Sequence, residues 1–106
     1  MAREYFFEVE TPLGFQVRTT RAYWEFLVGS KHPTMRGRRA DIIQVLADPE
    51  QVRRSRKDLS VYLFYRSEGS RWLCAVARRL DGRGFLITAY PTDTIKAGVT
   101  VWTRSS

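Results

Sequence analysis

Three apolar runs joined by short turn sequences constrain the fold of this chain more than any other feature. The runs are VYLFYR (61–66), WLCAVARR (72–79) and GFLITAY (84–90), and the sequences between them are SEGS and DGRG. β-Branched and aromatic residues favour strands, and short connections rich in Gly, Ser and Asp favour hairpins. The sequence therefore predicts an antiparallel meander of three strands.

The last of these runs places a threonine and a tyrosine in an otherwise apolar strand. Because side chains alternate along a strand, Leu86, Thr88 and Tyr90 are expected on one face and the residues between them on the other. The first face is expected to be partly polar, so that it meets solvent, a partner or a substrate.

The rest of the chain predicts two helices and a few further strands. Residues 4–10 and 14–19 flank a turn signal and predict a hairpin that extends the sheet or covers one of its edges. Residues 20–28 have the apolar spacing of a short helix. A second helix is expected from Pro33 to the Asp48–Pro49 stop, although Gly37 disfavours its first half.

Helices that precede strands, without βαβ alternation, predict an α+β fold. The expected architecture is two N-terminal helices packed on a four-stranded antiparallel sheet, with an N-terminal hairpin extension. VTVW (99–102) is expected to be the last, short strand at the edge. The chain has 106 residues and is 43% hydrophobic, enough for one core, so we expect a single domain with the hairpin at 1–19 and the core at 20–102.

The net charge of +7 predicts a polyanionic partner: RNA, DNA or an acidic protein. Of the 18 basic residues 15 are arginines, whose planar guanidinium suits bidentate phosphate contacts. Residues 30–57 hold eight basic residues against three acidic ones, which is +5 of the net +7. The alternative is a solvated basic surface without a specific partner.

Several classes of protein are excluded by the residues present. The chain has one cysteine, Cys74, and one histidine, His32, too few for a zinc site with four protein ligands. Phosphate-binding loops and the nucleophile elbow are absent, and no run approaches the ~20 apolar residues of a membrane span. We expect no metal, no cofactor, no membrane insertion and a cytoplasmic location.

Three groups of residues could carry chemistry. His32 lies in Lys-His-Pro at the expected start of the second helix, where unpaired backbone N–H groups attract phosphate. The run RRSRK (53–57) offers guanidinium groups and one serine hydroxyl in an expected loop. Tyr65, Thr88 and Tyr90 stand on expected neighbouring strands, with arginines near the strand ends. Each group also has a purely structural interpretation: a surface histidine, a solvated charge run and tyrosines covered by the helices.

These residue types suit one reaction, the cleavage of RNA by its own 2′-hydroxyl, which attacks the adjacent phosphate. The reaction needs a base, an acid and cations, but neither a metal nor a nucleophilic side chain. Aromatic rings interleaved with arginines would also suit unstacked RNA bases.

Three motifs follow one another in a recognisable order: KHP (31–33), LADPEQVRRS (46–55) and GFLITAYPTDTIKAG (84–98). Over about residues 24–102 the chain resembles the small phage and bacterial domains of the barnase/EndoU/colicin/RelE-like nuclease fold. The resemblance implies a metal-independent endoribonuclease, used as a toxin or in phage conflict, with helices on a four-stranded antiparallel sheet.

The resemblance also implies which residues act. By position, the catalytic residues would be His32, Ser55, Tyr65, Thr88 and Tyr90. The basic residues expected to bind RNA are Lys31, Arg53, Arg54, Arg56, Arg66, Arg78 and Lys96.

Two other functions are compatible with the same sequence. One is a non-catalytic module of the same fold that binds RNA. The other is an interaction domain for a cognate acidic antitoxin or immunity protein, in which the edge of the hairpin strand YFFEVE pairs with the partner.

Overall fold

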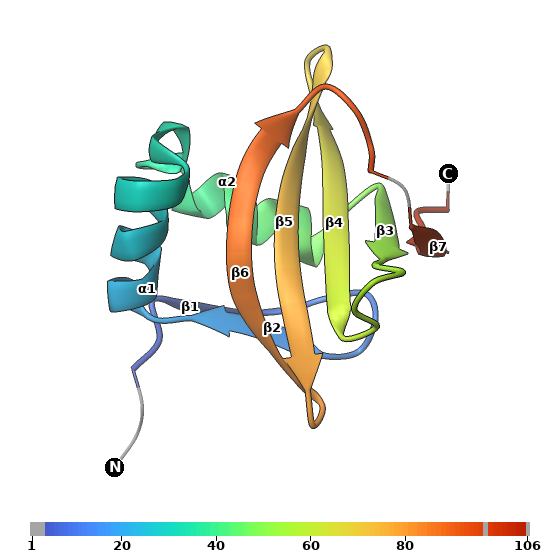
Figure 1. The fold of residues 1–106 in the computed structure, drawn as a ribbon, viewed down its shortest axis with the longest axis horizontal. Helices are drawn as coiled ribbons and strands as arrows, with labels where there is room; N and C mark the ends of the chain where they lie inside the picture. The colour runs from blue at the N-terminus through green and yellow to red at the C-terminus, as the bar shows by residue number, and fades with distance from the viewer. Residues whose placement is uncertain (1–3, 97, 106) are drawn as a thin grey trace.

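A strongly curled β-sheet, with helices on one face and at one side, forms the protein in a computed structural model that describes residues 4–96 and 98–105 (Figure 1). The elements are β1 (Phe7–Glu10), β2 (Gln16–Thr19), α1 (Arg21–Phe26), the π-helical turn η1 (Leu27–Lys31), the 3-10 turn η2 (Pro33–Met35), α2 (Arg39–Ala47), β3 (Gln51–Arg54), β4 (Val61–Glu68), β5 (Arg71–Leu80), β6 (Arg83–Thr92) and β7 (Val99–Thr103).

Within the described part of the chain the sheet has seven strands in the order β1-β2-β6-β5-β4-β3-β7. The predicted meander is confirmed as β4–β5–β6, and the predicted N-terminal hairpin as β1–β2. The turn between β5 and β6 places Asp81 and Gly82 at φ 53° and 78°, as a hairpin turn with two left-handed residues requires. The predicted edge strand is confirmed as β7, which ends the sheet beside β3.

The predicted four-stranded antiparallel sheet is wrong, because two further connections enlarge and mix it. The run 53–57 was expected to be a loop, but its first two residues belong to β3 (Gln51–Arg54), which pairs with both β4 and β7. Val52 is buried, whereas Arg53 and Arg54 are half-buried, and the pairing with two strands determines that the segment is extended. The hairpin joins the sheet as well, through a parallel pairing of β2 with β6.

The predicted pair of helices on one sheet face is also wrong. Only α2 lies across the back of β4 and β5 in the view of Figure 1, whereas α1 and η1 stand at the side of β6. The second helix begins at Arg39 rather than at Pro33, because Gly37 adopts a left-handed φ of 77° and separates η2 from α2.

Beyond its short pairing with β6, the hairpin crosses behind the long strands and does not run alongside them. β2 pairs with β6 through two residues, Val17 and Arg18, and then diverges. As a result Phe15 reaches the back of β4, where its ring centroid lies 5.5 Å from that of Tyr62 and 6.3 Å from that of Phe64. In Figure 1 the hairpin crosses behind the long strands at a steep angle.

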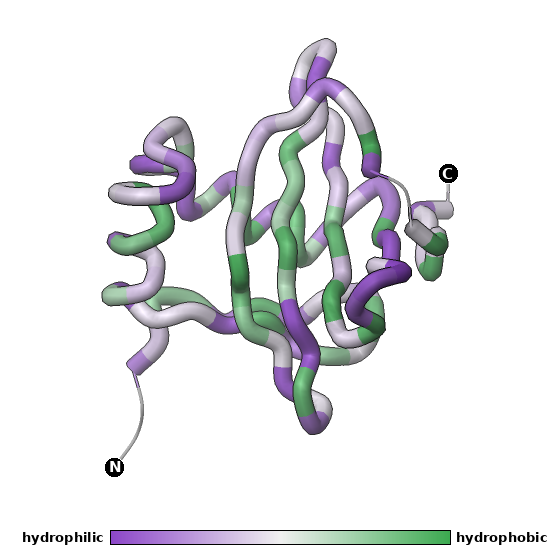
Figure 2. The backbone as a smooth tube through the Cα atoms, viewed as in Figure 1, coloured by the Kyte–Doolittle hydropathy of each residue, from purple (hydrophilic) through white to green (hydrophobic). Residues whose placement is uncertain are grey.

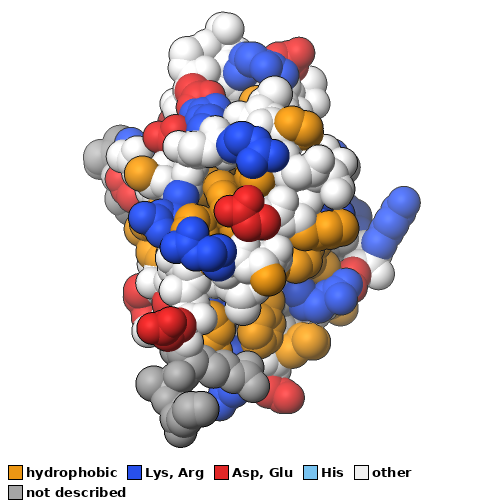
Figure 3. All heavy atoms as spheres, turned by 90° about the vertical axis from the view of Figure 1, so that its left-hand side faces the viewer, with side chains coloured by type: hydrophobic (Ala, Val, Ile, Leu, Met, Phe, Trp, Pro, Cys, Tyr) orange, Lys and Arg blue, Asp and Glu red, His pale blue; other side chains and the backbone are white. Residues whose placement is uncertain are grey.

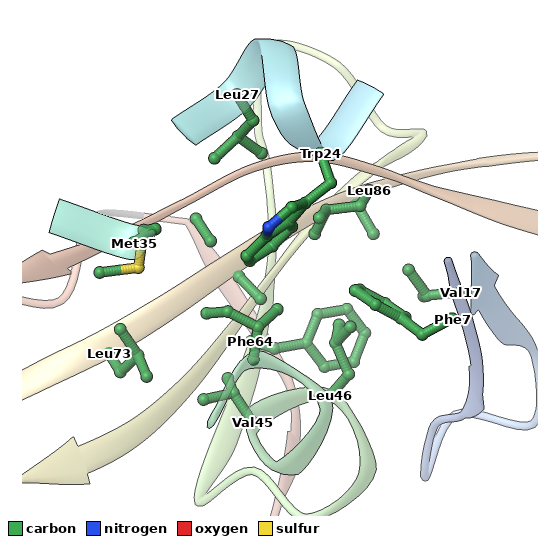
Figure 4. Close-up of a cluster of buried hydrophobic side chains, with 14 of the residues drawn as sticks. Phe7, Val17, Trp24, Leu27, Met35, Val45, Leu46, Phe64, Leu73 and Leu86 are labelled. Carbon is green, nitrogen blue, oxygen red and sulfur yellow. The ribbon is translucent and has the colours of Figure 1, made fainter. Parts of the chain in front are cut away.

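The main core fills the space between the sheet, α1, α2 and this hairpin. Trp24 of α1 points into it and meets Phe7 edge-on at 6.3 Å, with Leu27, Leu86 and the α2 residue Leu46 around them (Figure 4). β5 is apolar from Leu73 to Ala77 (Figure 2): Leu73, Ala75 and Ala77 belong to the main core, and Cys74 and Val76 belong to a smaller cluster on the other face. No helix in the described residues is long and apolar enough to cross a membrane.

Candidate functional site

A β-bulge in β6 determines which residues lie on the sheet face opposite α2, called the open face from here on. Val76 of β5 pairs with Thr88, whereas the next residue, Ala77, pairs with Leu86, so Ile87 is the extra residue. Strict alternation predicted Leu86 beside Thr88 and Tyr90, and that prediction is wrong. Leu86 is buried in the main core, and Phe85 instead shares the open face with Thr88 and Tyr90.

The bulge is held by a hydrogen bond from the neighbouring helix. The hydroxyl of Tyr23 in α1 donates to the carbonyl oxygen of Ile87 at 2.6 Å. At this point β6 has diverged from β2, and Tyr23 satisfies a carbonyl that has no strand partner on that side.

The open face is organised in rows of directly paired residues. Tyr65, Cys74 and Tyr90 form one row across β4, β5 and β6. Leu63, Val76 and Thr88 form the next row, displaced by two residues along each strand. The register, which the sequence left open, places Tyr65, Thr88 and Tyr90 in adjacent rows of the sheet.

A groove of about 510 Å³ runs over these rows. Its floor is the second row with Tyr90 and Val61, one wall is the loop after β3, and Lys96 lies at the other side. Its lining residues are Ser55, Arg56, Lys57, Val61, Leu63, Val76, Thr88, Tyr90 and Lys96. Three of them are cationic, and none of the described residues that line the groove is acidic. The groove thus combines an apolar floor with a positively charged rim.

His32 lies at the end of the groove formed by Tyr90. The two rings are tilted by 30° with their centroids 5.3 Å apart, and the Nζ of Lys96 lies 5.1 Å from the same tyrosine ring. His32 and Lys96, from different segments, therefore both lie against the ring of Tyr90, and of these three residues Tyr90 and Lys96 line the groove.

The predicted position of His32 at the start of the second helix is wrong, because His32 precedes only the 3-10 turn η2. Its backbone N–H donates to the carbonyl oxygen of Leu27 at 2.9 Å, which closes the π-helical turn. Only the three-residue turn η2 follows it, and α2 begins later, at Arg39. The feature that positions His32 is the π-helical turn η1, because it brings the imidazole onto Tyr90.

Burial keeps the acidic groups of the first row protonated. It raises the pKa of Tyr65 to about 12, and the neighbouring Cys74 adds to the rise. Burial likewise raises the pKa of the Cys74 thiol to about 12. The pKa of Tyr90 is raised further, by burial first and then by Cys74. At neutral pH both tyrosines therefore offer a hydroxyl hydrogen, and neither is a base.

Tyr65 and Ser55 have structural hydrogen bonds. Tyr65 is completely buried, and its hydroxyl accepts the backbone N–H of Lys96 at 3.1 Å. The Oγ of Ser55 accepts the N–H groups of Lys57 and Asp58, both at 3.2 Å, which shapes the loop at the groove wall. Ser55 lines the groove as well, so its hydroxyl hydrogen faces a region that a ligand can reach.

The hydroxyl of Thr88 is a further candidate for ligand contact. Its oxygen is buried and has no hydrogen-bond partner among the described atoms, although Thr88 lines the groove. A buried hydroxyl without a partner carries a desolvation cost that a ligand oxygen nearby would remove.

The basic residues expected to bind RNA separate into three groups. Arg56 and Lys96 line the groove, and Arg53 lies beside it, where it donates to the carbonyl oxygen of Lys96 at 3.4 Å. Arg78 is on the open face but forms an ion pair with Asp58 at 2.9 Å. The basic residues that give residues 30–57 their net charge of +5 are therefore close in sequence but dispersed in space.

The third group lies away from the groove. Arg54 stacks over Tyr62 on the opposite sheet face, at 5.7 Å, and Arg66 pairs with Asp48 at the end of α2, at 3.1 Å. Lys31 lies near the ring of Phe26, at 5.7 Å. On the side of the molecule that carries α1, basic, acidic and hydrophobic side chains are interspersed (Figure 3).

Sequence reasoning missed two members of the site. Lys57 belongs to the basic run but was not selected as an RNA ligand, although it lines the groove. Cys74 was considered only for disulfide or metal chemistry, and its place between two tyrosines follows from strand register, which no local pattern reveals.

No protein-family model, curated protein or solved structure matches the chain. The described residues contain no group of three His, Cys, Asp or Glu side chains placed to hold a metal ion. The function therefore has to be inferred from the groove itself.

Proposed function

We propose that the protein is a metal-independent endoribonuclease that binds single-stranded RNA in the groove on the open face. The observation that carries the proposal is the meeting of His32, Tyr90 and Lys96 at the end of a groove with a cationic rim. The three groups supply a proton acceptor, a proton donor and a positive charge. A role as a toxin or in phage conflict belongs to the same proposal and rests on the sequence resemblance.

In the proposed reaction the 2′-oxygen of the RNA attacks the adjacent phosphorus, and the bond from phosphorus to the 5′-oxygen breaks. His32 takes the proton of the 2′-hydroxyl, and Tyr90, which is protonated at neutral pH, gives its proton to the leaving 5′-oxygen. The proton on His32 then returns to Tyr90. The products are a 2′,3′-cyclic phosphate and a 5′-hydroxyl, and no external reactant is consumed.

The remaining groove residues act on charge rather than on protons. Lys96, Arg56 and Lys57 surround the floor and stabilise the negative charge that grows on the phosphate. The unpartnered hydroxyl of Thr88 donates to a phosphate oxygen. Leu63 and Val76 keep the floor apolar, which strengthens these interactions by excluding water.

The test is incubation of the purified protein, in EDTA, with end-labelled single-stranded RNA and with the same RNA carrying 2′-deoxyribose at the cleaved position. We expect cyclic phosphate products from the RNA and none from the substituted strand. His32→Ala should lower the cleavage rate by about 10²- to 10⁴-fold, because it removes the base. Tyr90→Phe keeps the ring against His32 and should lower the rate while leaving RNA binding unchanged. Cleavage by both variants at the wild-type rate would contradict the proposal.

A second candidate function is RNA binding without cleavage. It is favoured because two of the five predicted catalytic residues, Tyr65 and Ser55, form structural hydrogen bonds. Only His32 and Tyr90 then remain as the principal groups for proton transfer. Such a protein would bind RNA more weakly as the salt concentration rises, as expected for phosphate contacts, and would leave the RNA intact in the assay above.

An acidic antitoxin or immunity protein as partner is a separate proposal, and the hairpin edge is a poor place for it. β1 is at one end of the sheet, but it carries Glu8 and Glu10, which would repel an acidic strand. The cationic groove is the better complement, and competition between such a protein and RNA would test it.

A further inference from the structure

A second hollow lies on the same side of the sheet as the groove and is called the side pocket here. It has a volume of about 360 Å³ and is lined by Phe85, Leu80 and Arg78 from the long strands, and by Arg18 and Tyr23 from β2 and α1, among others. Most of its surface is apolar, in contrast to a simple anion site.

The side pocket continues the groove along β5 and β6. Arg78 follows Val76 by two residues, so the two side chains lie on the same face of β5, and Val76 belongs to the groove floor. Arg78 is also paired directly with Val61, another residue of the groove floor. On β6 the bulge residue Ile87 lines the side pocket and its neighbour Thr88 lines the groove.

The centre of the side pocket is an aromatic ring between two arginines. The register places Arg18, Phe85 and Arg78 in one row across β2, β6 and β5. Phe85 is 40% exposed although it is a large apolar side chain, and the guanidinium carbon of Arg18 lies 5.9 Å from its ring centre. Arg78 is held by Asp58 and Arg18 by Glu8, both at 2.9 Å, so the cations flanking the ring are fixed.

Arg18 also has hydrogen-bonding capacity left over. Its side chain is 14% exposed; one terminal N–H group donates to the hydroxyl of Tyr5 at 3.3 Å, and the guanidinium carbon lies 5.0 Å from the centre of that ring, whereas the buried Nε has no hydrogen-bond partner among the described atoms. Both guanidinium groups keep their carboxylate partners, but a purely aliphatic occupant would desolvate their remaining N–H donors, which is unfavourable. A flat occupant with hydrogen-bond acceptors at its edge satisfies both the ring and the arginines.

We propose that the side pocket holds one unstacked nucleobase of the RNA strand whose phosphate lies in the groove. The base stacks on Phe85, Arg18 contacts its edge, and Arg78 stands between the base and the phosphate bound in the groove. Single-stranded RNA is recognised in this way, by stacking of splayed bases on aromatic side chains. The inference rests on the RNA-binding part of the proposed function, but not on cleavage.

The side pocket would make the N-terminal hairpin part of the recognition surface. Arg18 lies in β2, outside residues 24–102 over which the sequence resembles known nucleases. The hairpin therefore adds a base-reading element to the sheet, and it selects the base next to the phosphate bound in the groove.

The test measures binding of wild-type protein to a short single-stranded 2′-O-methyl RNA, which lacks the attacking hydroxyl and stays intact. A series of the same strand carries one abasic nucleotide at each position in turn. Base stacking on an aromatic ring is lost on alanine substitution, so Phe85→Ala should raise Kd by about 5- to 150-fold. Phe85→Trp should retain the affinity, and Val99→Ala, which truncates an exposed apolar residue of β7, is the matched control.

The abasic series distinguishes a base pocket from general contact. At one position the abasic nucleotide should weaken binding to wild-type protein and have no further effect on Phe85→Ala, as expected for two partners of one contact. The inference is overturned if no position shows this coupling, if Phe85→Ala binds like Val99→Ala, or if the RNA is not bound. A protein that shows the coupling but does not cleave ordinary RNA would refute the endoribonuclease proposal alone, and cleavage without coupling would refute the base pocket alone.

Discussion

The hydroxyl of Tyr65 accepts a hydrogen bond of 3.1 Å from the backbone N–H of Lys96. Tyr65 is buried in the middle of the sheet, whereas Lys96 is exposed in the connection from β6 to β7. One buried side chain thus fixes the backbone that carries a cation of the groove, and the two residues are far apart in sequence.

Replacing Tyr65 by Phe removes the acceptor and keeps the ring. We expect the free energy of unfolding to fall by about 0.5–1.5 kcal/mol, as measured by urea denaturation, because one hydrogen bond is lost. Amide exchange at Lys96 should become faster. RNA should bind more weakly, while the cleavage rate at saturating RNA stays close to that of wild type, since the hydroxyl has no access to the substrate. A fall in that rate of about 10²-fold with unchanged Kd would instead give Tyr65 a direct role in proton transfer.

Arg56 and Arg54 provide a matched pair for mapping the RNA surface, because they are two residues apart and face different sides of the molecule. Arg56 lines the groove, and Arg54 stacks over Tyr62 on the other sheet face. Arg56→Ala should weaken RNA binding and reduce the slope of log Kd against log salt by about one, as the loss of one phosphate contact does.

Arg54→Ala should leave both the affinity and the slope unchanged. Fluorescence anisotropy titrations over a range of salt concentrations would measure them. Equal effects of the two substitutions would show that RNA is attracted by the total charge and not by the groove.

Gly84 is expected to resist substitution because the hairpin crosses β6 at this residue. A Cβ there would lie 2.7 Å from the carbonyl oxygen of Gln16 and 2.8 Å from the ring of Phe15. The strand and the hairpin would have to separate, so Gly84→Ala should lower the free energy of unfolding by about 1–3 kcal/mol. Gly29→Ala is the control, since its Cβ would meet nothing within 4 Å. Thermal unfolding would compare them, and similar melting temperatures for the two variants would contradict the crossing.

The row of Tyr65, Cys74 and Tyr90 predicts a loss of stability at alkaline pH. The pKa of Cys74 rises from 9.0 to about 12 on folding, so the folded state holds its proton more tightly than the unfolded state. The stabilisation is complete below pH 9 and is lost as the pH rises towards 12, because the unfolded thiol ionises first. By pH 10.5 the cysteine alone should lower the free energy of unfolding by about 2 kcal/mol.

Urea denaturation at pH 7 and pH 10.5 would measure this loss. Cys74→Ala should remove part of the difference between the two pH values, and the tyrosines should account for the remainder. An equal difference in wild type and variant would mean that the thiol does not contribute.

The parts of the fold that the sequence predicts well are those set by local patterns. The runs around Phe64, Ala75 and Ala89 are rich in apolar strand formers and end in turn residues, so their pairing as a meander could be read directly. The same holds for the hairpin of Val9 and Val17. Helix α2 was recognised from its apolar spacing, but not its start.

The predictions that were wrong concern features of the fold that depend on long-range contacts. The bulge at Ile87 has no local sequence signal, and it reversed the predicted faces of Phe85 and Leu86. β3 is a strand because β4 and β7 lie on either side of it, not because Arg53 and Arg54 favour one. The same dependence on the sheet decides that Arg54 and Arg56, so close in sequence, point to different sides.

The two residue pairs between β2 and β6 also determine when the sheet can be completed during synthesis. Val17 and Arg18 are made early, but their partners Gly84 and Phe85 emerge only after most of the chain. An isolated two-stranded hairpin is at best marginally stable in water, so this hairpin depends on its packing against the rest of the sheet and α2. Closing such a long loop is entropically costly and slow, and β7 must reach back to β3 in the same way. The hairpin that supplies Arg18 to the side pocket is therefore among the first segments translated, but its pairing with the sheet can form only after β6 has been made.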